Sequence, residues 1–146
     1  MFYEINKFTL AILPNGRNGS IIYEGNKIIH SNFNPVSLIK KNCLINGCTY
    51  IGRLKSAEFL TGYKYKTPIL IKEEGNLIFF PTNSPRIKNC AWICLNNVAH
   101  INLLNRGTDI VFLNKIFLHF DISFYILNNQ YLRAVNLEAK LRKNKV

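Results

Sequence analysis

The chain has 146 residues, which is the size of one domain, and 48% of them are hydrophobic, too many for a disordered chain. Its 19 Lys and Arg residues outnumber 8 Asp and Glu residues and leave a net charge of +11. No apolar run approaches the roughly 18 residues that a membrane span needs. The N-terminus lacks the basic region of a secretory signal, so we expect the four cysteines to be reduced thiols. These features predict a soluble, cytoplasmic, basic protein.

The positive charge is unevenly distributed along the chain. Residues 53–88 contain seven basic and three acidic residues, and residues 133–146 contain five and one. Residues 89–132 contain two of each and are neutral. AT-rich codons would inflate the number of lysines, but they do not explain why carboxylates are scarce. Clustered positive charge is typical of proteins that bind a polyanion, with nucleic acid the first candidate, although a solubilising surface is the alternative.

The first half of the chain predicts strands followed by two helices. Strands are expected at 8–13, 20–23 and 27–30, and the last two form a hairpin around Glu24-Gly25-Asn26. A helix is expected to begin at Pro35 with Asn34 as its N-cap and to end near Gly47. Residues 49–61 have helical spacing of apolar residues, and Gly62 can end that helix.

The second half predicts mainly strands. Segments 68–72 and 76–80 form a second hairpin, and 82–89 is a polar loop. Segments 91–95, 98–103, 109–113 and 116–120 are expected to form an antiparallel meander. A helix follows from Ser123, with an apolar face made by Ile126, Tyr131, Ala134, Leu137 and Leu141. The predicted fold is a single α+β domain, residues 1–146, with a mainly antiparallel sheet.

The residues that usually support catalysis or metal binding are not arranged for either. Cys43 and Cys48 are separated by four residues and Cys90 and Cys94 by three, which is loose spacing for a zinc site, and buried thiols are the alternative. The three histidines have no carboxylate at a catalytic spacing, and no phosphate-binding glycine loop is present. We therefore predict no metal, no cofactor and no enzymatic activity.

The basic residues of 53–88 form pairs that could contact phosphates. If Lys64 and Lys66 lie on a strand, they share one face while Tyr63 and Tyr65 share the other, and an ordinary solvated edge strand is the alternative. Segment 82–86 combines hydroxyls, an amide and an arginine, which could enter a narrow minor groove. The residues predicted to contact DNA are Arg53, Lys55, Lys64, Lys66, Thr82, Ser84, Arg86, Lys88 and, on the last helix, Arg133. Trp92 and the aromatic residues Phe79, Phe80 and Phe112 are assigned to the core or to a subunit interface.

A collinear set of short motifs resembles the ComK family of competence transcription factors. The resemblance covers nearly the whole chain, and its motifs are Tyr3-Glu4-Ile5-Asn6, Ala11-Ile12-Leu13-Pro14, Pro35 with Leu38, Cys43, Gly47 with Tyr50, Gly52 and Arg53, Lys66-Thr67-Pro68-Ile69, Phe80-Pro81-Thr82 with Ser84, Cys90-Ala91-Trp92-Ile93, and Asn129-Gln130 with Arg133. This resemblance implies an activator of DNA-uptake genes that binds paired A/T-rich boxes through the minor groove. It also implies dimers that assemble into tetramers, and an adaptor of the Clp protease system as a partner, besides RNA polymerase.

Two features depart from the family pattern. The chain ends soon after Arg133, where better-known members continue, and this puts activation or proteolytic control in question. Cys43 and Cys90 fit the pattern, whereas Cys48 and Cys94 do not. The resulting hypothesis is a nucleoid-associated, cytoplasmic, DNA-binding activator. The alternative is a protein-interaction module, a shortened paralogue that pairs with a full-length relative or titrates the adaptor without activating transcription.

Overall fold

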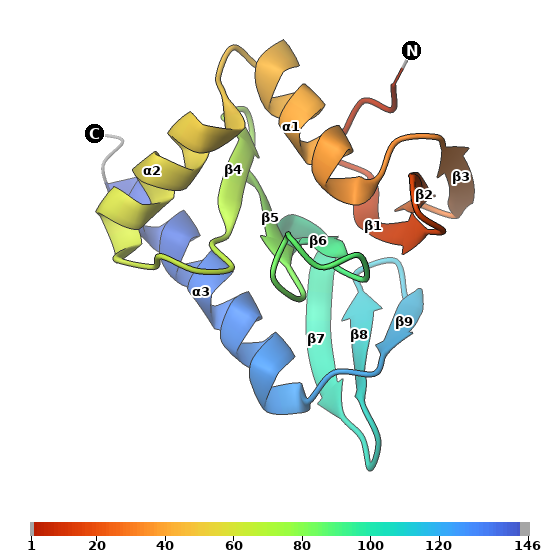
Figure 1. Cartoon of the computed structure of the whole chain (residues 1–146). Coiled ribbons are helices and arrows are strands. Elements are labelled where there is room, and N and C mark those ends of the chain that lie inside the picture. Colours follow the sequence, from red (N-terminus) through yellow and green to blue (C-terminus); the bar gives the residue numbers. More distant parts are fainter. Residues whose placement is uncertain (1, 144–146) are drawn as a thin grey trace.

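The computed structural model describes residues 2–143, and in them three helices cover two antiparallel sheets (Figure 1). The large sheet has the strand order β3-β2-β1-β6-β5-β4 and the small sheet the order β7-β8-β9. The predicted α+β class is therefore confirmed. The strands are β1 (Thr9–Asn15), β2 (Gly19–Glu24), β3 (Lys27–Ser31), β4 (Ile69–Lys72), β5 (Leu77–Pro81), β6 (Trp92–Cys94), β7 (Val98–Leu103), β8 (Thr108–Phe112) and β9 (Phe117–Phe120). The helices are α1 (Pro35–Ile45), α2 (Tyr50–Thr61) and α3 (Phe124–Lys143).

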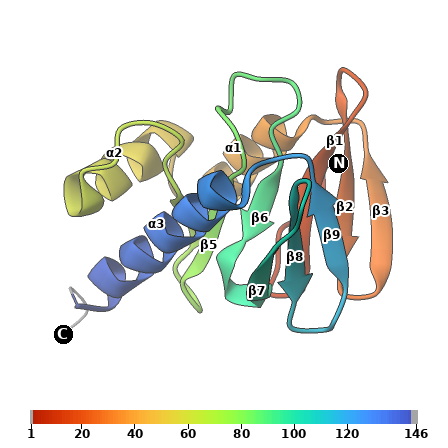
Figure 2. The same ribbon diagram turned by 90° about the horizontal axis from the view of Figure 1, so that it is seen from below.

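The large sheet separates two hydrophobic clusters, because neighbouring residues of a strand point to opposite faces. On β1, Ile12 joins the cluster that contains Leu38 of α1, whereas Ala11 joins the cluster that contains Leu127 of α3. Trp92, Phe79, Phe80 and Phe112 are all almost completely buried, as predicted. Helix α3 therefore covers the face opposite α1, and the small sheet packs on the same side as α3 (Figure 2).

The predicted helix starts are confirmed by capping hydrogen bonds. The Asn34 side chain accepts a hydrogen bond of 2.9 Å from the backbone N–H of Ser37, and Pro35 occupies the first turn. Thr49 caps α2 in the same way by accepting from Gly52. Each cap satisfies one of the first-turn amides that the helix itself leaves without an acceptor.

The predicted four-strand meander is wrong at its first turn. Strands β7–β9 form a meander, but β6 lies in the large sheet between β1 and β5. Between β6 and β7 the chain makes a short 3₁₀ turn, Leu95–Asn97, instead of a hairpin. The side chain of Asn97 donates to the carbonyls of Lys7 and Thr9, and Asn96 accepts from the backbone N–H of Ile78. These long-range bonds hold the turn against distant strands, and no local pattern shows them.

Two further expectations are corrected. Residues 63–66 are an irregular loop and not a strand, and the backbone of Lys66 has a positive φ of 49°. On α3, Ile126 is 45% exposed, while Leu127 and Gln130 take the buried positions. Gln130 donates to the carbonyl of Lys66 in that loop, so the buried face of α3 is not purely apolar.

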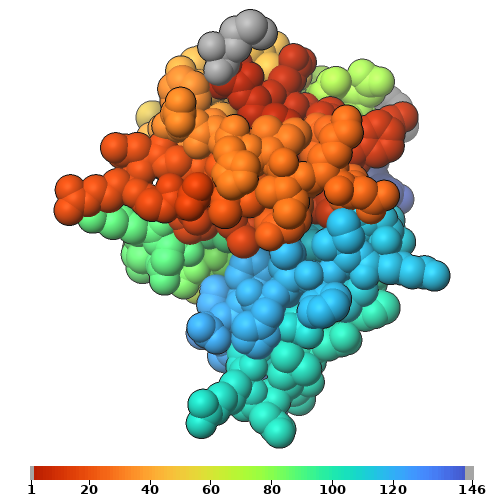
Figure 3. All heavy atoms as spheres, turned by 90° about the vertical axis from the view of Figure 1, so that its right-hand side faces the viewer, coloured from red at the N-terminus to blue at the C-terminus, as the bar shows by residue number. Residues whose placement is uncertain are grey.

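The β1–β3 end of the large sheet lies beside the small sheet, as the space-filling view shows (Figure 3). Asn114, in the turn between β8 and β9, donates a 3.0 Å hydrogen bond to the carbonyl of Gly25 in the β2–β3 turn. No helix within residues 2–143 is long and apolar enough to cross a membrane.

Candidate nucleic-acid interface

A concave surface of about 730 Å³ lies between the helices α1 and α2 and two loops, 62–68 and 82–91. We call it the basic groove. Its lining residues are Val36, Lys40, Tyr50, Leu54, Lys64, Tyr65, Lys66, Thr67, Ser84, Pro85 and Arg86. Four of these carry positive charge and none carries negative charge, so the groove suits an anionic ligand.

The cations of the groove are not neutralised by the protein. The ion pairs in the described residues use other cations, namely Arg53, Lys72, His119 and Arg142. Lys40 lies 5.6 Å from the ring of Tyr50, which orients its stem but leaves its charge uncompensated. Cations without a carboxylate partner remain free to bind phosphate oxygens.

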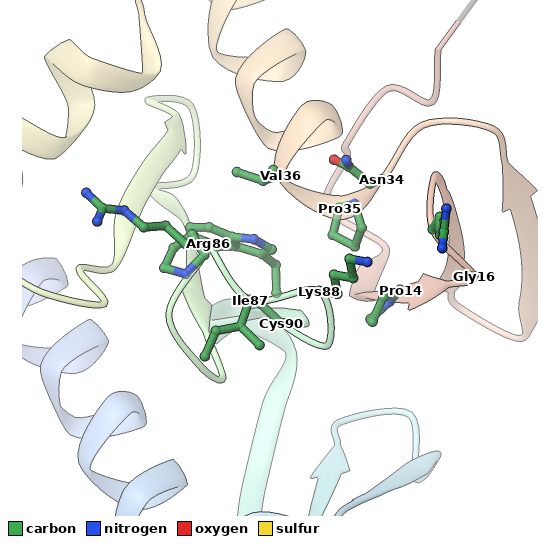
Figure 4. A pocket seen from close by; sticks show the side chains of 12 residues that line it. Pro14, Gly16, Asn34, Pro35, Val36, Arg86, Ile87, Lys88 and Cys90 are labelled. Carbon is green, nitrogen blue, oxygen red and sulfur yellow. The ribbon is translucent and has the colours of Figure 1, made fainter.

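A second, smaller pocket of about 180 Å³ adjoins the groove and shares Val36, Pro85 and Arg86 with it. Figure 4 shows Lys88 between Pro14 of β1 and Pro35 of α1. The side chain of Arg86 points in the opposite direction, away from Lys88. In the loop 82–91, Lys88 therefore lines the smaller pocket only, whereas Arg86 lines both concavities.

Loop 62–68 is attached to α3 by hydrogen bonds from side chains to its backbone. Gln130 Nε2 donates to the carbonyl of Lys66 at 2.7 Å and to the carbonyl of Pro81 at 2.9 Å. Because Pro81 is the last residue before loop 82–91, one buried glutamine joins the bases of both loops that border the groove.

Two more residues of α3 hold the same loop. Arg133 Nη1 donates to the carbonyl of Tyr65 at 2.9 Å, and its guanidinium lies 4.7 Å from the ring centre of Tyr63. Asn136 donates to the hydroxyl of Tyr63 at 2.9 Å. Gln130, Arg133 and Asn136 are spaced three residues apart and so share one side of the helix. Gln130 and Arg133 of the C-terminal motif, together with Asn136, therefore position the loop that carries Lys64 and Lys66.

Loop 82–91 is closed by Thr82, whose side chain is 1% exposed. Its hydroxyl accepts a 3.0 Å hydrogen bond from the backbone N–H of Ala91 and donates to Asn83 at 2.8 Å. Thr82 is thus a structural residue of the loop. Ser84 lines the groove.

The structure brings together only some of the residues that the sequence suggested. Lys64, Lys66, Ser84 and Arg86 line the groove, and Lys88 lines the adjoining pocket. Arg53, by contrast, has a side chain only 14% exposed, 3.8 Å from Glu73. Lys55 is exposed on α2 but lines neither concavity, and Thr82 and Arg133 bond to the protein's own backbone. The stretch 53–88 is therefore not one continuous contact surface.

Two cations were not anticipated. Lys40 reaches the groove from α1, and Arg17 reaches the smaller pocket from the β1–β2 turn. The sequence does show a basic pair, Lys40-Lys41, directly after the buried Leu38-Ile39. This pattern does not indicate which neighbouring elements α1 packs against, so it could not place Lys40 in the groove.

The cysteines are set up for packing. Cys43, Cys90 and Cys94 are buried in one hydrophobic cluster, and Cys48 is packed against it. Burial raises the pKa of Cys43 and of Cys94 to about 12, so these thiols stay protonated and unreactive. Within residues 2–143, no three His, Cys, Asp or Glu side chains gather closely enough to hold a metal ion.

The family model described as "ComK protein" matches residues 1–145. A protein of Bacillus subtilis (strain 168) named "Competence transcription factor" is 28% identical over 144 residues, which cover 96% of this chain and 75% of that relative. No solved structure matches the chain.

Proposed function

This chain belongs to the ComK family, and from this premise we propose that it is a competence transcription factor that binds A/T-rich DNA through the basic groove. The observation that carries the proposal is the set of unpaired cations around one concavity: Lys40, Lys64, Lys66 and Arg86. The named relative supports the same regulatory role. In this proposal residues 1–146 act as one DNA-binding domain, without cofactor or catalytic activity.

The size of the groove limits what it can hold. A concavity of about 730 Å³ falls in the range of small-ligand sites, roughly 300–1,000 Å³, and is too small for a whole duplex. We infer that a short stretch of one phosphodiester strand lies in it. Lys64 and Lys66 contact phosphates from one side and Arg86 from the other.

The loop 82–91 supplies the contact with the bases in this proposal. It projects between the two concavities, and Ser84 and Arg86 lie at its start. Arg86 contacts a phosphate at the edge of the narrow minor groove, whose negative potential in A/T-rich DNA attracts arginine, and Ser84 contacts the base edges. Because the minor groove distinguishes A·T from G·C and little else, useful specificity requires several half-sites, which agrees with a dimer or tetramer.

Such a factor would work in the cytoplasm at the nucleoid and would contact RNA polymerase, with a Clp-protease adaptor as a further partner. We propose Arg133 as a residue that positions the loop 62–68, since its guanidinium is already engaged with Tyr65 and Tyr63.

The test is fluorescence anisotropy with an A/T-box duplex and a G/C-rich duplex of equal length, at several salt concentrations. We expect the A/T duplex to bind more tightly by about 4 kcal/mol or more, the lower end for specific over non-specific sites. The dependence of log K on log salt then counts the phosphates neutralised. Equal and weak binding of both duplexes would contradict the proposal. In that case, stable hetero-oligomers with a full-length relative would favour the interaction-module alternative.

A further inference from the structure

Tyr65 stands out among the exposed residues of the described chain. Its side chain is 80% exposed, and it is the large exposed apolar residue that lines the basic groove. It is flanked in sequence by the two cations Lys64 and Lys66. Other strongly exposed aromatic residues, such as Phe59 at 88% and Tyr125 at 74%, lie outside the groove.

The backbone beneath Tyr65 is held firmly although its side chain is free. Its carbonyl accepts from Arg133 at 2.9 Å, and the next carbonyl accepts from Gln130 at 2.7 Å. Thr67 Oγ1 also donates to the carbonyl of Tyr63 at 3.2 Å, which closes the loop on itself. An aromatic ring on a fixed backbone loses little conformational freedom on binding.

Lys66 adds a second sign of constraint. Its φ of 49° lies in the left-handed region, which a lysine seldom adopts without an external reason. The hydrogen bond from Gln130 to its carbonyl provides that reason. Gln130 therefore holds the part of the loop that presents Tyr65 to the groove in this conformation.

We propose that Tyr65 is a wedge that inserts between two base pairs of the bound DNA from the minor-groove side, while Lys64 and Lys66 bind the phosphates that flank the opened step. The inference rests on the proposed function and adds a residue and a mechanism to it. Proteins that bind the minor groove often insert an apolar side chain at a base step, which unstacks the step and bends the duplex. Such a wedge enters most easily at a flexible TpA step, and a duplex made only of G·C pairs contains no such step.

The test uses an A/T-box duplex in which 2-aminopurine replaces one adenine at each TpA step in turn. This base is quenched when stacked and fluoresces when a neighbour is displaced. We expect the native protein to raise the fluorescence at one step. The Tyr65→Ala variant should abolish that rise, and the Tyr65→Phe variant should retain it. Tyr65→Ala should also weaken binding by about tenfold, the loss expected for one aromatic stacking contact.

Tyr125→Ala is the matched control, because it removes an equally exposed tyrosine outside the groove. It should leave both fluorescence and affinity unchanged. Lys64→Ala and Lys66→Ala should each reduce the salt slope by about 1, whereas Tyr65→Ala should leave the slope unchanged. Circular dichroism confirms that each variant is folded.

The outcomes separate the two claims. If the protein binds the A/T duplex but the fluorescence rises at no step, the wedge is disproved and the proposed function stands. The same conclusion follows if the Tyr65→Ala variant raises the fluorescence as much as the native protein does. If the native protein has no preference for the A/T duplex, the proposed function fails and the wedge fails with it.

Discussion

The basic groove and the small sheet β7–β9 are both built from short segments and turns, but their charged side chains are arranged differently. Around the groove, four cations from α1 and two loops face one concavity, and within residues 2–143 none of them forms an ion pair with a carboxylate. In the small sheet, Arg106 and Lys115 lie in the two separate turns at opposite ends of β8. There, His119 contacts Asp109 at 2.8 Å and Asp121 at 3.4 Å.

Net charge alone therefore does not indicate which surface of this protein would bind a polyanion. A polyanion binds where the fold gathers cations on one surface and leaves them without carboxylate partners.

Removing charge from the two regions should have unequal consequences. Lys64→Ala with Arg86→Ala should weaken binding to every duplex and lower the salt slope by about 2, because two phosphate contacts are lost. Arg106→Ala with Lys115→Ala removes the same two residue types and should leave the slope unchanged. Anisotropy titrations at four or more salt concentrations measure both. Equal slopes in the two double variants would show that the groove is not the contact surface.

Gly107→Ala should damage the small sheet without touching the groove. Gly107 has a φ of +73°, and a Cβ there would collide with the carbonyl oxygen of Phe120. The left-handed backbone costs about 1–2 kcal/mol and the crowding about 1–3 kcal/mol, so we expect about 2–5 kcal/mol less stability in urea unfolding.

Gly62→Ala is the control, since its φ is +82° but the space around it is open. It should cost only the backbone part, about 1–2 kcal/mol. The folded fraction of Gly107→Ala should keep the native salt slope. A reduced slope would mean that the small sheet contributes to DNA binding.

Gln130→Leu should destabilise the two loops that border the groove. It removes the hydrogen bonds to the carbonyls of Lys66 and Pro81, and such buried acceptors cost about 1–3 kcal/mol when unpaired. Because Gln130 Oε1 is itself buried without a partner, its removal offsets part of that cost. We expect lower stability together with weaker DNA binding. Asn129→Ala, at an exposed neighbouring position, should change neither.

Asp109→Asn should produce the smallest effect. The hydrogen bond to Asp109, followed by that to Asp121, raises the pKa of His119 above its usual 6.5. Because this pKa is raised, the interaction of His119 with the two carboxylates stabilises the folded protein fully below about pH 6.5. The stabilisation is lost as the pH rises through the pKa of His119 in the folded protein. Asp109→Asn should bring the pKa of His119 back toward 6.5, as measured by NMR titration. It should also make the free energy of unfolding less dependent on pH near and above about pH 6.5. DNA affinity should not follow this titration, and a parallel change would link the small sheet to binding.

Local features of the fold could be predicted from the sequence. The Asn34 cap, the start of α2 near Thr49 and the hairpin around Gly25 depend on residues a few positions apart. The polar loop after β5 was likewise visible in the sequence, and in the structure it carries Ser84 and Arg86, which line the basic groove. These features succeed because their hydrogen bonds connect near neighbours.

The misassigned elements depend on distant partners. The position of β6 is set by pairing with β1, about 80 residues earlier, and by the amide of Asn97, which bonds to Lys7 and Thr9. Arg53 and Lys64 were predicted to contact DNA on the same ground, as members of basic pairs, but tertiary packing turned Arg53 toward Glu73. The spacing of the basic residues does not show which of them the fold leaves without an acidic partner.

The sequence by itself determined the α+β class, the helix ends, most strands and the excess of positive charge, since these follow from local propensity and composition. Only the tertiary structure decided which cations share a surface. Lys40, Lys64 and Arg86 come from three separate segments, and Gln130 joins the bases of two of them from the last helix. The physical reason is that a surface is formed by side chains that long-range packing brings together, whereas the pattern in the sequence reports only the face of a single element.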